Sequence, residues 1–322
     1  MSGTVSGTGE VIVRPLTEAD LPEADRICRL AFGTYVGMTE PERFFGDADM
    51  VATRWRAGPS SVLAAEADGR LVGSNFAARW GSVAFFGPLS VDPAYWDRGV
   101  ARRLLEPTMA MIDSWGVRFA GLFTFAASAK HVALYQKYGF WPRFLTAIMS
   151  RPVGPPPAAA PGTLMSGLAA ADRDAALAAA RELTGAVYPG LDVSREVTAV
   201  LEQNIGDVVL TGAGPGPLDG LAVCHIGAGS EAGGGTCYIK FGAARPGPGA
   251  EARFVALLDA CHRLAAARGA TTLAAGANAG RDQAWRAMTG YGFRSSMQGV
   301  AMHRPNTDGY NVPASYLIDD WR

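Results

Sequence analysis

The sequence predicts an α+β fold with a mixed sheet, built twice along the chain as two similar units. Apolar stretches of strand length alternate with amphipathic stretches of helix length in both halves, as in domains whose helices pack on a sheet. Both halves also end a late helix at a similar motif, Lys-Tyr-Gly-Phe140 in the first and Gly-Tyr-Gly-Phe293 in the second. A length of 322 residues favours two domains over one. We therefore expect an internal duplication of one unit.

A proline-rich stretch marks the boundary between the two units. Residues 151–162 contain prolines that resist both helix and sheet and favour an extended spacer. The expected domains are therefore 11–150 and 163–322, joined by this linker. Residues 1–10 are polar and lack the apolar core of a signal peptide, so we expect a flexible N-terminus.

The first unit is expected to begin with a short strand and a helix, whose polar start from Thr17 to Asp20 is typical of an N-cap. Asp68-Gly69 predicts a tight hairpin turn between its second and third strands. Pro93 marks the turn between an apolar strand and the helix that follows. The expected strands are 11–15, 61–67, 70–79, 82–91, 118–126 and 144–150, and the expected helices are 17–32, 41–55, 99–115 and 130–138.

The second unit repeats this order loosely. Its expected strands are 163–168, 207–211, 220–226, 236–243, 271–277 and 295–302, and its expected helices are 169–185, 194–204, 251–268 and 281–289. The tail at 309–322 is unusually aromatic for a chain end. We expect residues 316–318 to form a docked final strand, which either completes the second sheet or crosses to the first.

Composition excludes several classes of function. The formal net charge is -1 and no basic block stands out, which disfavours nucleic acid as a partner. No apolar run reaches the roughly 18 residues of a membrane span. The four cysteines, Cys28, Cys224, Cys237 and Cys261, are widely spaced without a C-x-x-C pair, so we expect buried thiols in a reducing cytoplasm.

Two Cys-His neighbours raise the question of a metal site. Cys224 and His225 are adjacent on an expected strand, so their side chains point to opposite faces. Cys261 and His262 are adjacent on an expected helix and lie about 100° apart. Neither pair can converge on one ion, and we expect no metal.

The segment from Leu89 to Leu105 predicts an anion site. A strand delivers small residues, Gly99 and Ala101, to the start of a helix. The first N–H groups of a helix have no internal partner and lie at the positive end of its dipole, so they bind phosphate readily. A cofactor that carries a diphosphate is the natural ligand. The alternative is an ordinary strand–turn–helix whose Gly serves packing.

Two motifs in this unit resemble those of the GCN5-related N-acetyltransferase superfamily, here arranged as a tandem pair. The helix-start motif of that family is matched by Val91-Asp-Pro93 and Gly99-Val-Ala101, with Trp96 where a Gln or Arg would stand. Its late motif is matched by Tyr135 and Gly139-Phe140, with Ser128 where an Asn would stand. The resemblance covers roughly 11–150 well and 163–302 weakly.

The resemblance implies two tandem acyl-CoA N-acyltransferase-like domains and acetyl-CoA as co-substrate, with no metal. Acetyl-CoA would lie in a V between the strand that ends at Val91 and the strand at 118–126. Its pantetheine would pair with the backbone of Leu89 and Val91, and its diphosphate would sit on the N–H groups from Asp97 to Ala101. The cofactor-binding residues implied are Leu89, Val91, Asp97, Arg98, Gly99, Val100, Ala101 and Ser128. Arg102 or Arg103 would add charge.

Acyl transfer to an amine needs a neutral amine, a stabilised oxyanion and a proton for the departing thiolate. Tyr135 matches the general acid of the family, and a backbone N–H near Leu89 or Ser90 would polarise the acetyl carbonyl. The strands 82–91 and 118–126 contain no carboxylate to act as base. Three alternatives stay open: a water relay, a carboxylate of the 40–49 segment, or an acceptor that arrives neutral. Lys130 and His131 are candidates for phosphate contact or for the base.

The second unit departs from the motifs. Glu251 replaces the small residue at Ala101, Pro246 and Pro248 cannot donate N–H groups, and Met288 stands where the acid would be. We expect this unit to keep the fold, lack the cofactor and shape the acceptor cleft. The expected activity is direct transfer of an acetyl or short acyl group to a primary amine, without an acyl-enzyme. A small-molecule acceptor is expected, but small amines, amino sugars, amino acids, antibiotics and peptide N-termini all stay open. The rivals are a non-catalytic acyl-CoA-binding module and catalysis in the second unit; a monomer and a homodimer both stay open.

Overall fold

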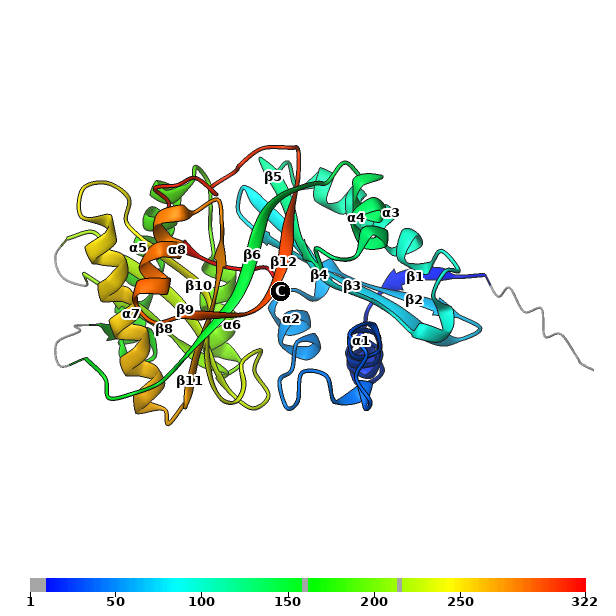
Figure 1. The fold of residues 1–322 in the computed structure, drawn as a ribbon, viewed down its shortest axis with the longest axis horizontal. Helices are drawn as coiled ribbons and strands as arrows, with labels where there is room; N and C mark the ends of the chain where they lie inside the picture. The colour runs from blue at the N-terminus through cyan, green and yellow to red at the C-terminus, as the bar shows by residue number, and fades with distance from the viewer. Residues whose placement is uncertain (1–9, 158–161, 213–215) are drawn as a thin grey trace, which may run out of the picture.

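The structure is a computed structural model that describes residues 10–157, 162–212 and 216–322. The expected flexible segment 1–10 therefore lies almost entirely outside the described residues, and so does part of the linker at 151–162. The described chain forms a mixed α and β structure in which helices cover a long twisted sheet (Figure 1). The predicted α+β class with a mixed sheet is confirmed.

The elements of the first half follow the predicted order. They are β1 (Ile12–Pro15), α1 (Leu21–Tyr35), α2 (Val51–Ala57), β2 (Val62–Ala67), β3 (Arg70–Trp80), β4 (Val83–Val91), α3 (Val100–Ser114), β5 (Phe119–Thr124), α4 (Ala129–Gln136) and β6 (Trp141–Pro152). The helix expected at 41–55 is wrong in its first part. Phe45 and Gly46 have φ angles of 72° and 56°, so the chain there cannot be helical, and α2 begins only at Val51.

The second half also follows the predicted order. Its elements are β7 (Thr163–Leu164), α5 (Ala170–Val187), α6 (Ser194–Glu202), β8 (Gly206–Thr211), β9 (Gly220–Gly227), β10 (Gly233–Ala244), α7 (Ala250–Ala267), β11 (Thr272–Asn278), α8 (Asp282–Gly290), β12 (Arg294–Arg304) and β13 (Leu317–Ile318). The strand expected at 163–168 is shorter, because a 3₁₀ turn at Met165–Gly167 ends it. None of the helices in the described ranges is long and apolar enough to cross a membrane.

Within the described residues the strands form one continuous sheet, in the order β1-β2-β3-β4-β5-β12-β6-β11-β10-β9-β8-β7, with β13 beside β10. Each half places one strand in the sheet of the other half. Strand β12 pairs with β5, and β6 pairs with β11, while β6 and β12 pair with each other at the centre of the molecule (Figure 1). A fragment ending at residue 150 would therefore lack the strand that covers β5, and the limits at 150 and 163 stay a prediction for folding units.

Strands β4 and β5 diverge, and this opening positions the site. They pair in parallel only from Val83 to Phe85, against Phe119 to Gly121. Beyond this point an irregularity in the β3–β4 register, between the pairs at Phe86 and Leu89, turns β4 away from its neighbour. Helices α3 and α4 cover the same end of the sheet, with Leu105, Ile112 and Phe140 buried in the core beneath them.

The corresponding place in the second half is occupied by the chain itself. Strands β10 and β11 pair in parallel from Thr236 to Ile239 and then separate. Strand β13 enters beside β10 there, with Ile318 opposite Gly242 and Leu317 opposite Ala243. The tail then continues to Trp321 and Arg322, which border a cavity of the first half. The expected docking of the tail is confirmed, and it reaches both halves.

Candidate functional site

A cavity of about 920 Å³ lies where β4 and β5 diverge. Helix α1, the 44–50 segment, β4, β5, the start of α3 and helix α4 supply most of its wall. The second half adds Glu231, Ala232, Met297, Trp321 and Arg322. Of the residues proposed from the sequence, those that border the cavity are Leu89, Val91, Asp97, Gly99, Val100, Ala101, Arg102, Ser128, Lys130, His131 and Tyr135.

The start of helix α3 offers unpaired backbone N–H groups to this cavity. Gly99 precedes the helix with a φ of 80°, a conformation that glycine adopts without strain. A Cβ built on Gly99 would meet no atom within 4 Å, so the space in front of the helix is open. The first N–H groups of the helix, from Val100 onward, have no carbonyl partner in the helix. This end of the cavity suits a diphosphate.

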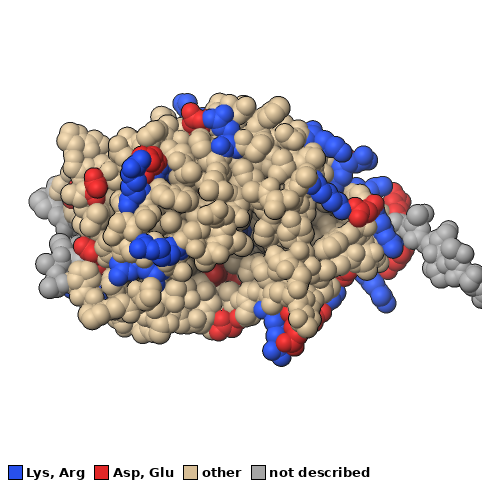
Figure 2. All heavy atoms as spheres, in the orientation of Figure 1, with Lys and Arg blue, Asp and Glu red and all other residues tan. Residues whose placement is uncertain are grey.

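Arg98 lies apart from the other proposed residues. It is exposed and does not border the cavity, and its guanidinium stacks on the ring of Tyr95 with its central carbon 5.2 Å from the ring centroid. Exposed basic side chains nevertheless surround the α3 start: Arg98, Arg102, Arg103, Lys130 and Lys137. Figure 2 shows basic side chains gathered over the α3 and α4 end of this face. Lys130 forms an ion pair with Asp97, linking the α3 turn to α4.

Trp96, which departs from the family motif, contacts the strand that would pair with a pantetheine arm. Its indole N–H donates to the carbonyl of Val91 at 2.8 Å. The Asp92 N–H donates back to Val72 on β3 at 2.9 Å, so by strand alternation the N–H and carbonyl of Val91 point the other way, into the opening. The Val91 carbonyl is therefore already engaged, whereas Leu89 lies on the same side of the strand and borders the cavity.

Tyr135 lies at the inner wall of the cavity. Its side chain is buried, and its ring packs edge-on against Phe86 at a centroid distance of 5.7 Å. Burial raises the pKa of the Tyr135 hydroxyl well above its ordinary value, so the group stays protonated at neutral pH. Among the described residues the hydroxyl has no hydrogen-bond partner, and it is free to donate to a ligand.

The start of helix α4 uses two of the candidate residues. Ser128 is the N-cap, and its hydroxyl oxygen accepts from the His131 N–H at 3.3 Å. His131 borders the cavity with its ring 5.0 Å from that of Tyr35. Burial, and then the neighbouring charge of Lys130, lower the pKa of His131, which keeps the imidazole neutral at pH 7. A neutral imidazole is able to accept a proton.

The four acidic side chains of the 40–49 segment do not border the cavity. Glu40 pairs with Arg43 at 3.2 Å, and Glu42 pairs with Arg26 at 3.4 Å. Asp47 accepts from the Gly234 N–H at 2.7 Å, and Asp49 accepts from the Ala52 N–H at 2.8 Å at the start of α2. The segment contributes apolar side chains instead: Phe44, Phe45, Ala48 and Met50.

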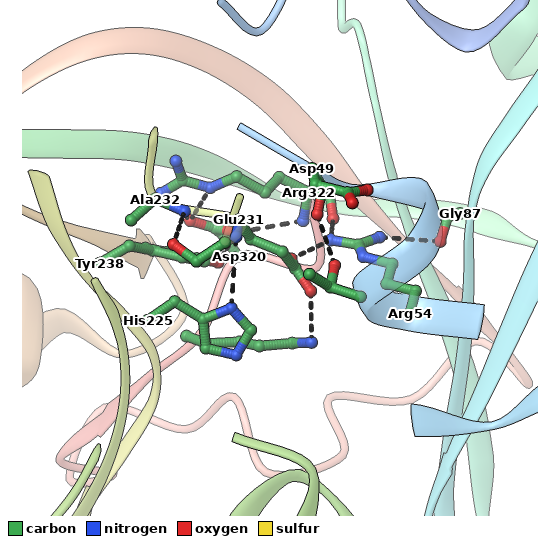
Figure 3. Close-up of polar contacts among 12 residues, drawn as sticks. Asp49, Arg54, Gly87, His225, Glu231, Ala232, Tyr238, Asp320 and Arg322 are labelled. Atoms are coloured by element: carbon green, nitrogen blue, oxygen red, sulfur yellow. Dashed lines mark hydrogen bonds and ion pairs between the residues drawn. The ribbon is translucent and has the colours of Figure 1, made fainter. Parts of the chain in front are cut away.

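A buried ion network joins the two halves beside the cavity, and sequence reasoning did not find it. The Glu231 carboxylate accepts from Arg54 at 2.8 Å (Figure 3). It also accepts from Lys240 at 2.6 Å. Lys240 also contacts Glu196 at 2.9 Å. Burial by itself raises the pKa of Glu231, but the charges of Arg54 and Lys240 outweigh it and hold that pKa well below its ordinary range. The one sequence signal was a lysine inside the apolar run Cys237–Phe241.

Arg54 also fixes the point where β4 turns away. Its guanidinium donates to the carbonyl of Gly87 at 2.8 Å and to the backbone oxygen of Arg322 (Figure 3). Arg322 in turn pairs with Asp320 at 2.7 Å and lies over the ring of Tyr238 at 3.9 Å. The geometry of the cavity wall thus depends on groups from both halves.

The second half repeats the backbone of the anion site without its opening. Gly249 precedes α7 with a φ of 80°, the same angle as Gly99. Glu251 lies in the first turn of α7, and the Tyr316 hydroxyl of the tail donates to its carboxylate at 3.4 Å. Met288 is fully buried. Within the described ranges no three His, Cys, Asp or Glu side chains are grouped to hold a metal ion, and all four cysteines are buried and free.

Comparison with known proteins supports the resemblance to acetyltransferases that the sequence motifs indicated. The sequence profile of the acetyltransferase (GNAT) family matches residues 26–140. A putative acetyltransferase from Pyrococcus horikoshii aligns over 100% of this chain and 98% of its own, with a TM-score of 0.67 and 17% identity. A GCN5-related N-acetyltransferase from Sphaerobacter thermophilus aligns over 91% of this chain and 95% of its own, with a TM-score of 0.56 and 17% identity. No curated protein matches the sequence.

The two solved structures share the fold of nearly the whole chain, at identities that establish the fold alone. The profile match spans the segment from α1 to the end of the α4 region, which holds the diverging strands, the α3 start and Tyr135. Residues 26–140 therefore match the acetyltransferase (GNAT) family, and nearly the whole chain shares the fold of the two solved structures.

Proposed function

We propose that this protein is an N-acyltransferase that uses the cavity between β4 and β5 to move an acetyl or short acyl group from coenzyme A to a primary amine. One observation carries the proposal. The open helix start at Gly99 and the Tyr135 hydroxyl, which binds no protein group in the described residues, border the same cavity, within the segment that matches the acetyltransferase family. The second half would be a degenerate copy that shapes the acceptor side.

The residues of the first half fit the parts of acyl-CoA. The N–H groups from Asp97 to Ala101 would hold the diphosphate, with Lys130 and Arg102 adding charge. Leu89 offers backbone groups to the pantetheine, in the manner of an added strand. When bound, acyl-CoA supplies an activated thioester. Tyr135 would donate its proton to the sulfur as the carbon–sulfur bond breaks.

Calorimetric titration of acetyl-CoA tests the location of the site. Gly99→Asp places a carboxylate where the diphosphate would lie, and Gly249→Asp makes the same change at the matching φ of the second half. We expect one site per chain, weakened at least tenfold by Gly99→Asp because like charges repel, and unchanged by Gly249→Asp. Loss of binding in Gly249→Asp alone would move the site to the second half.

A non-catalytic acyl-CoA-binding module is the second candidate, favoured by Trp96. Its bond to the Val91 carbonyl removes one backbone acceptor from the opening. Acetyl-CoA binding without release of free thiol in the presence of any amine would support this reading. Release of thiol that depends on both the amine and acetyl-CoA would exclude it.

A further inference from the structure

The structure points to the class of acceptor: we propose that the cavity takes a hydrophobic primary amine carrying an aromatic group, and that the amine reacts as the uncharged base. This inference rests on the proposed function, and it adds the substrate class that the family match leaves open. It is carried by the rings that form one wall of the cavity and by the pairing of every carboxylate at its border.

One wall of the cavity is a continuous cluster of aromatic side chains. Phe32 and Tyr35 of α1, Phe44 and Phe45 of the following segment, and Phe125 after β5 all border the cavity. The rings of Tyr35 and Phe125 lie 4.7 Å apart, those of Phe44 and Phe45 lie 4.4 Å apart, and Phe32 contacts both groups at 5.7–6.2 Å. Rings packed in tilted and edge-on pairs offer faces and edges to a further ring.

The carboxylates at the border of the cavity are already paired. Asp97 is bound to Lys130, and the fully buried Glu231 is bound to both Arg54 and Lys240. Within the described part of the chain these are the only acidic residues that border the cavity. A diamine or polyamine would therefore bring a second ammonium to a wall with no free counter-charge, and desolvating that charge is costly.

The same surroundings account for the missing base. An apolar environment disfavours the ammonium form of a bound amine, so binding itself shifts the acceptor toward the neutral form that attacks. The amine nitrogen then forms its bond to the acyl carbon while the carbon–sulfur bond breaks. Tyr135 gives its proton to the sulfur, the nitrogen loses a proton to solvent or to neutral His131, and water restores the Tyr135 proton. Two protons and one acyl group are thereby accounted for.

Equilibrium binding to the CoA-saturated protein tests the class without relying on turnover. We expect 2-phenylethylamine to bind at least tenfold more tightly than ethylamine or 1,4-diaminobutane. Phe45→Ala should remove most of this preference while leaving acetyl-CoA affinity unchanged, because the truncation removes the ring face that would contact the aromatic group of the amine. Trp141→Ala, which truncates an exposed aromatic side chain away from the cavity, is the matched control.

The outcomes separate the two levels of the proposal. Tighter binding of 1,4-diaminobutane than of 2-phenylethylamine would overturn the acceptor class and leave the acyl-CoA site standing. Equal loss of ethylamine and 2-phenylethylamine binding in Phe45→Ala would also overturn it, because it would show general damage to the cavity. Absence of acetyl-CoA binding to the wild type would instead overturn the proposed function, and the acceptor inference with it.

Discussion

At the scale of single residues, the site combines one tyrosine hydroxyl with apolar surroundings that offer it no hydrogen-bond partner. Tyr135 is buried among apolar side chains, and within the described residues its hydroxyl has no protein partner. The hydroxyl faces the cavity, so a bound ligand can become its hydrogen-bond partner. Trp96 is the opposite case, since its indole fills a hydrogen bond that a ligand would otherwise make.

Tyr135→Phe is the sharpest test at this scale. The variant keeps the ring that packs on Phe86 and removes only the hydroxyl. We expect thiol release to fall by 10²–10⁴-fold in kcat, as for the loss of a general acid, with little change in acetyl-CoA affinity. Steady-state kinetics and calorimetry on both proteins measure this. Tyr138→Phe, on the same helix region but outside the cavity wall, is the control, and full activity of Tyr135→Phe would rule out the acid role.

At the scale of elements, local sequence signals were sufficient to predict the turns and the helix starts that they mark. Asp68-Gly69 predicted the β2–β3 hairpin, and Gly99 predicted the start of α3 to within one residue. The helix expected at 41–55 was wrong over residues 44–50. Phe44 and Phe45 pack on Phe32 there, and no local sequence pattern encodes this long-range packing or the non-helical φ values that accompany it. Contacts between residues far apart in the sequence, such as Arg54 with Glu231, cannot be predicted from the spacing of residue types along the chain.

The tail strand β13 fills the place in the second half that corresponds to the cavity of the first half. It lies where β10 and β11 separate, which is where the first half keeps its cavity. Ile318 is fully buried there, with a methyl group 3.3 Å from the position of a Cβ on Gly242. The tail thus takes the backbone partners that a pantetheine arm would need in the second half.

Truncation of Ile318 measures how firmly this element is held. Ile318→Ala should lower the free energy of unfolding by about 2–5 kcal/mol, as for other buried isoleucines, without adding a second acetyl-CoA site. Ile12→Ala, at a position 58% exposed on β1, should change it by less than about 0.5 kcal/mol. Chemical denaturation and calorimetric stoichiometry are the two measurements. Equal stability of both variants would show that the tail is not packed as described.

At the scale of the whole molecule, the two halves are joined by an exchange of strands as well as by side-chain contacts. Strands β6 and β12 each complete the sheet of the other half, so neither half has a closed sheet of its own. The ion network of Arg54, Glu231 and Lys240 lies at the same junction and reaches the Gly87 carbonyl at the mouth of the cavity. We therefore infer that the molecule unfolds as one unit, and that loosening the junction also disturbs the site.

Glu231→Gln tests this coupling. The substitution keeps the volume and removes the charge, which leaves Arg54 and the buried Lys240 with less compensation. Breaking a buried ion pair from one side costs about 3–5 kcal/mol, so a single unfolding transition should move to lower denaturant, and acetyl-CoA affinity should fall with it. Glu42→Gln, in an exposed pair with Arg26, should change stability by about 0–1 kcal/mol.

The pH dependence of stability, measured for the wild type and Glu231→Gln, separates the contribution of the Glu231 charge from that of side-chain packing. Because the folded pKa of Glu231 is depressed, its ionised form stabilises the wild type fully above the ordinary glutamate value of about 4.3. That contribution decreases as the pH falls below this value, because the unfolded state then takes up a proton, and it is gone below the folded pKa. Glu231→Gln has no carboxyl to titrate there, so the stability difference between the two proteins should be constant from pH 6 to 8 and should narrow in acid. A difference that stays constant down to pH 3 would show that packing, and not charge, joins the halves at this point.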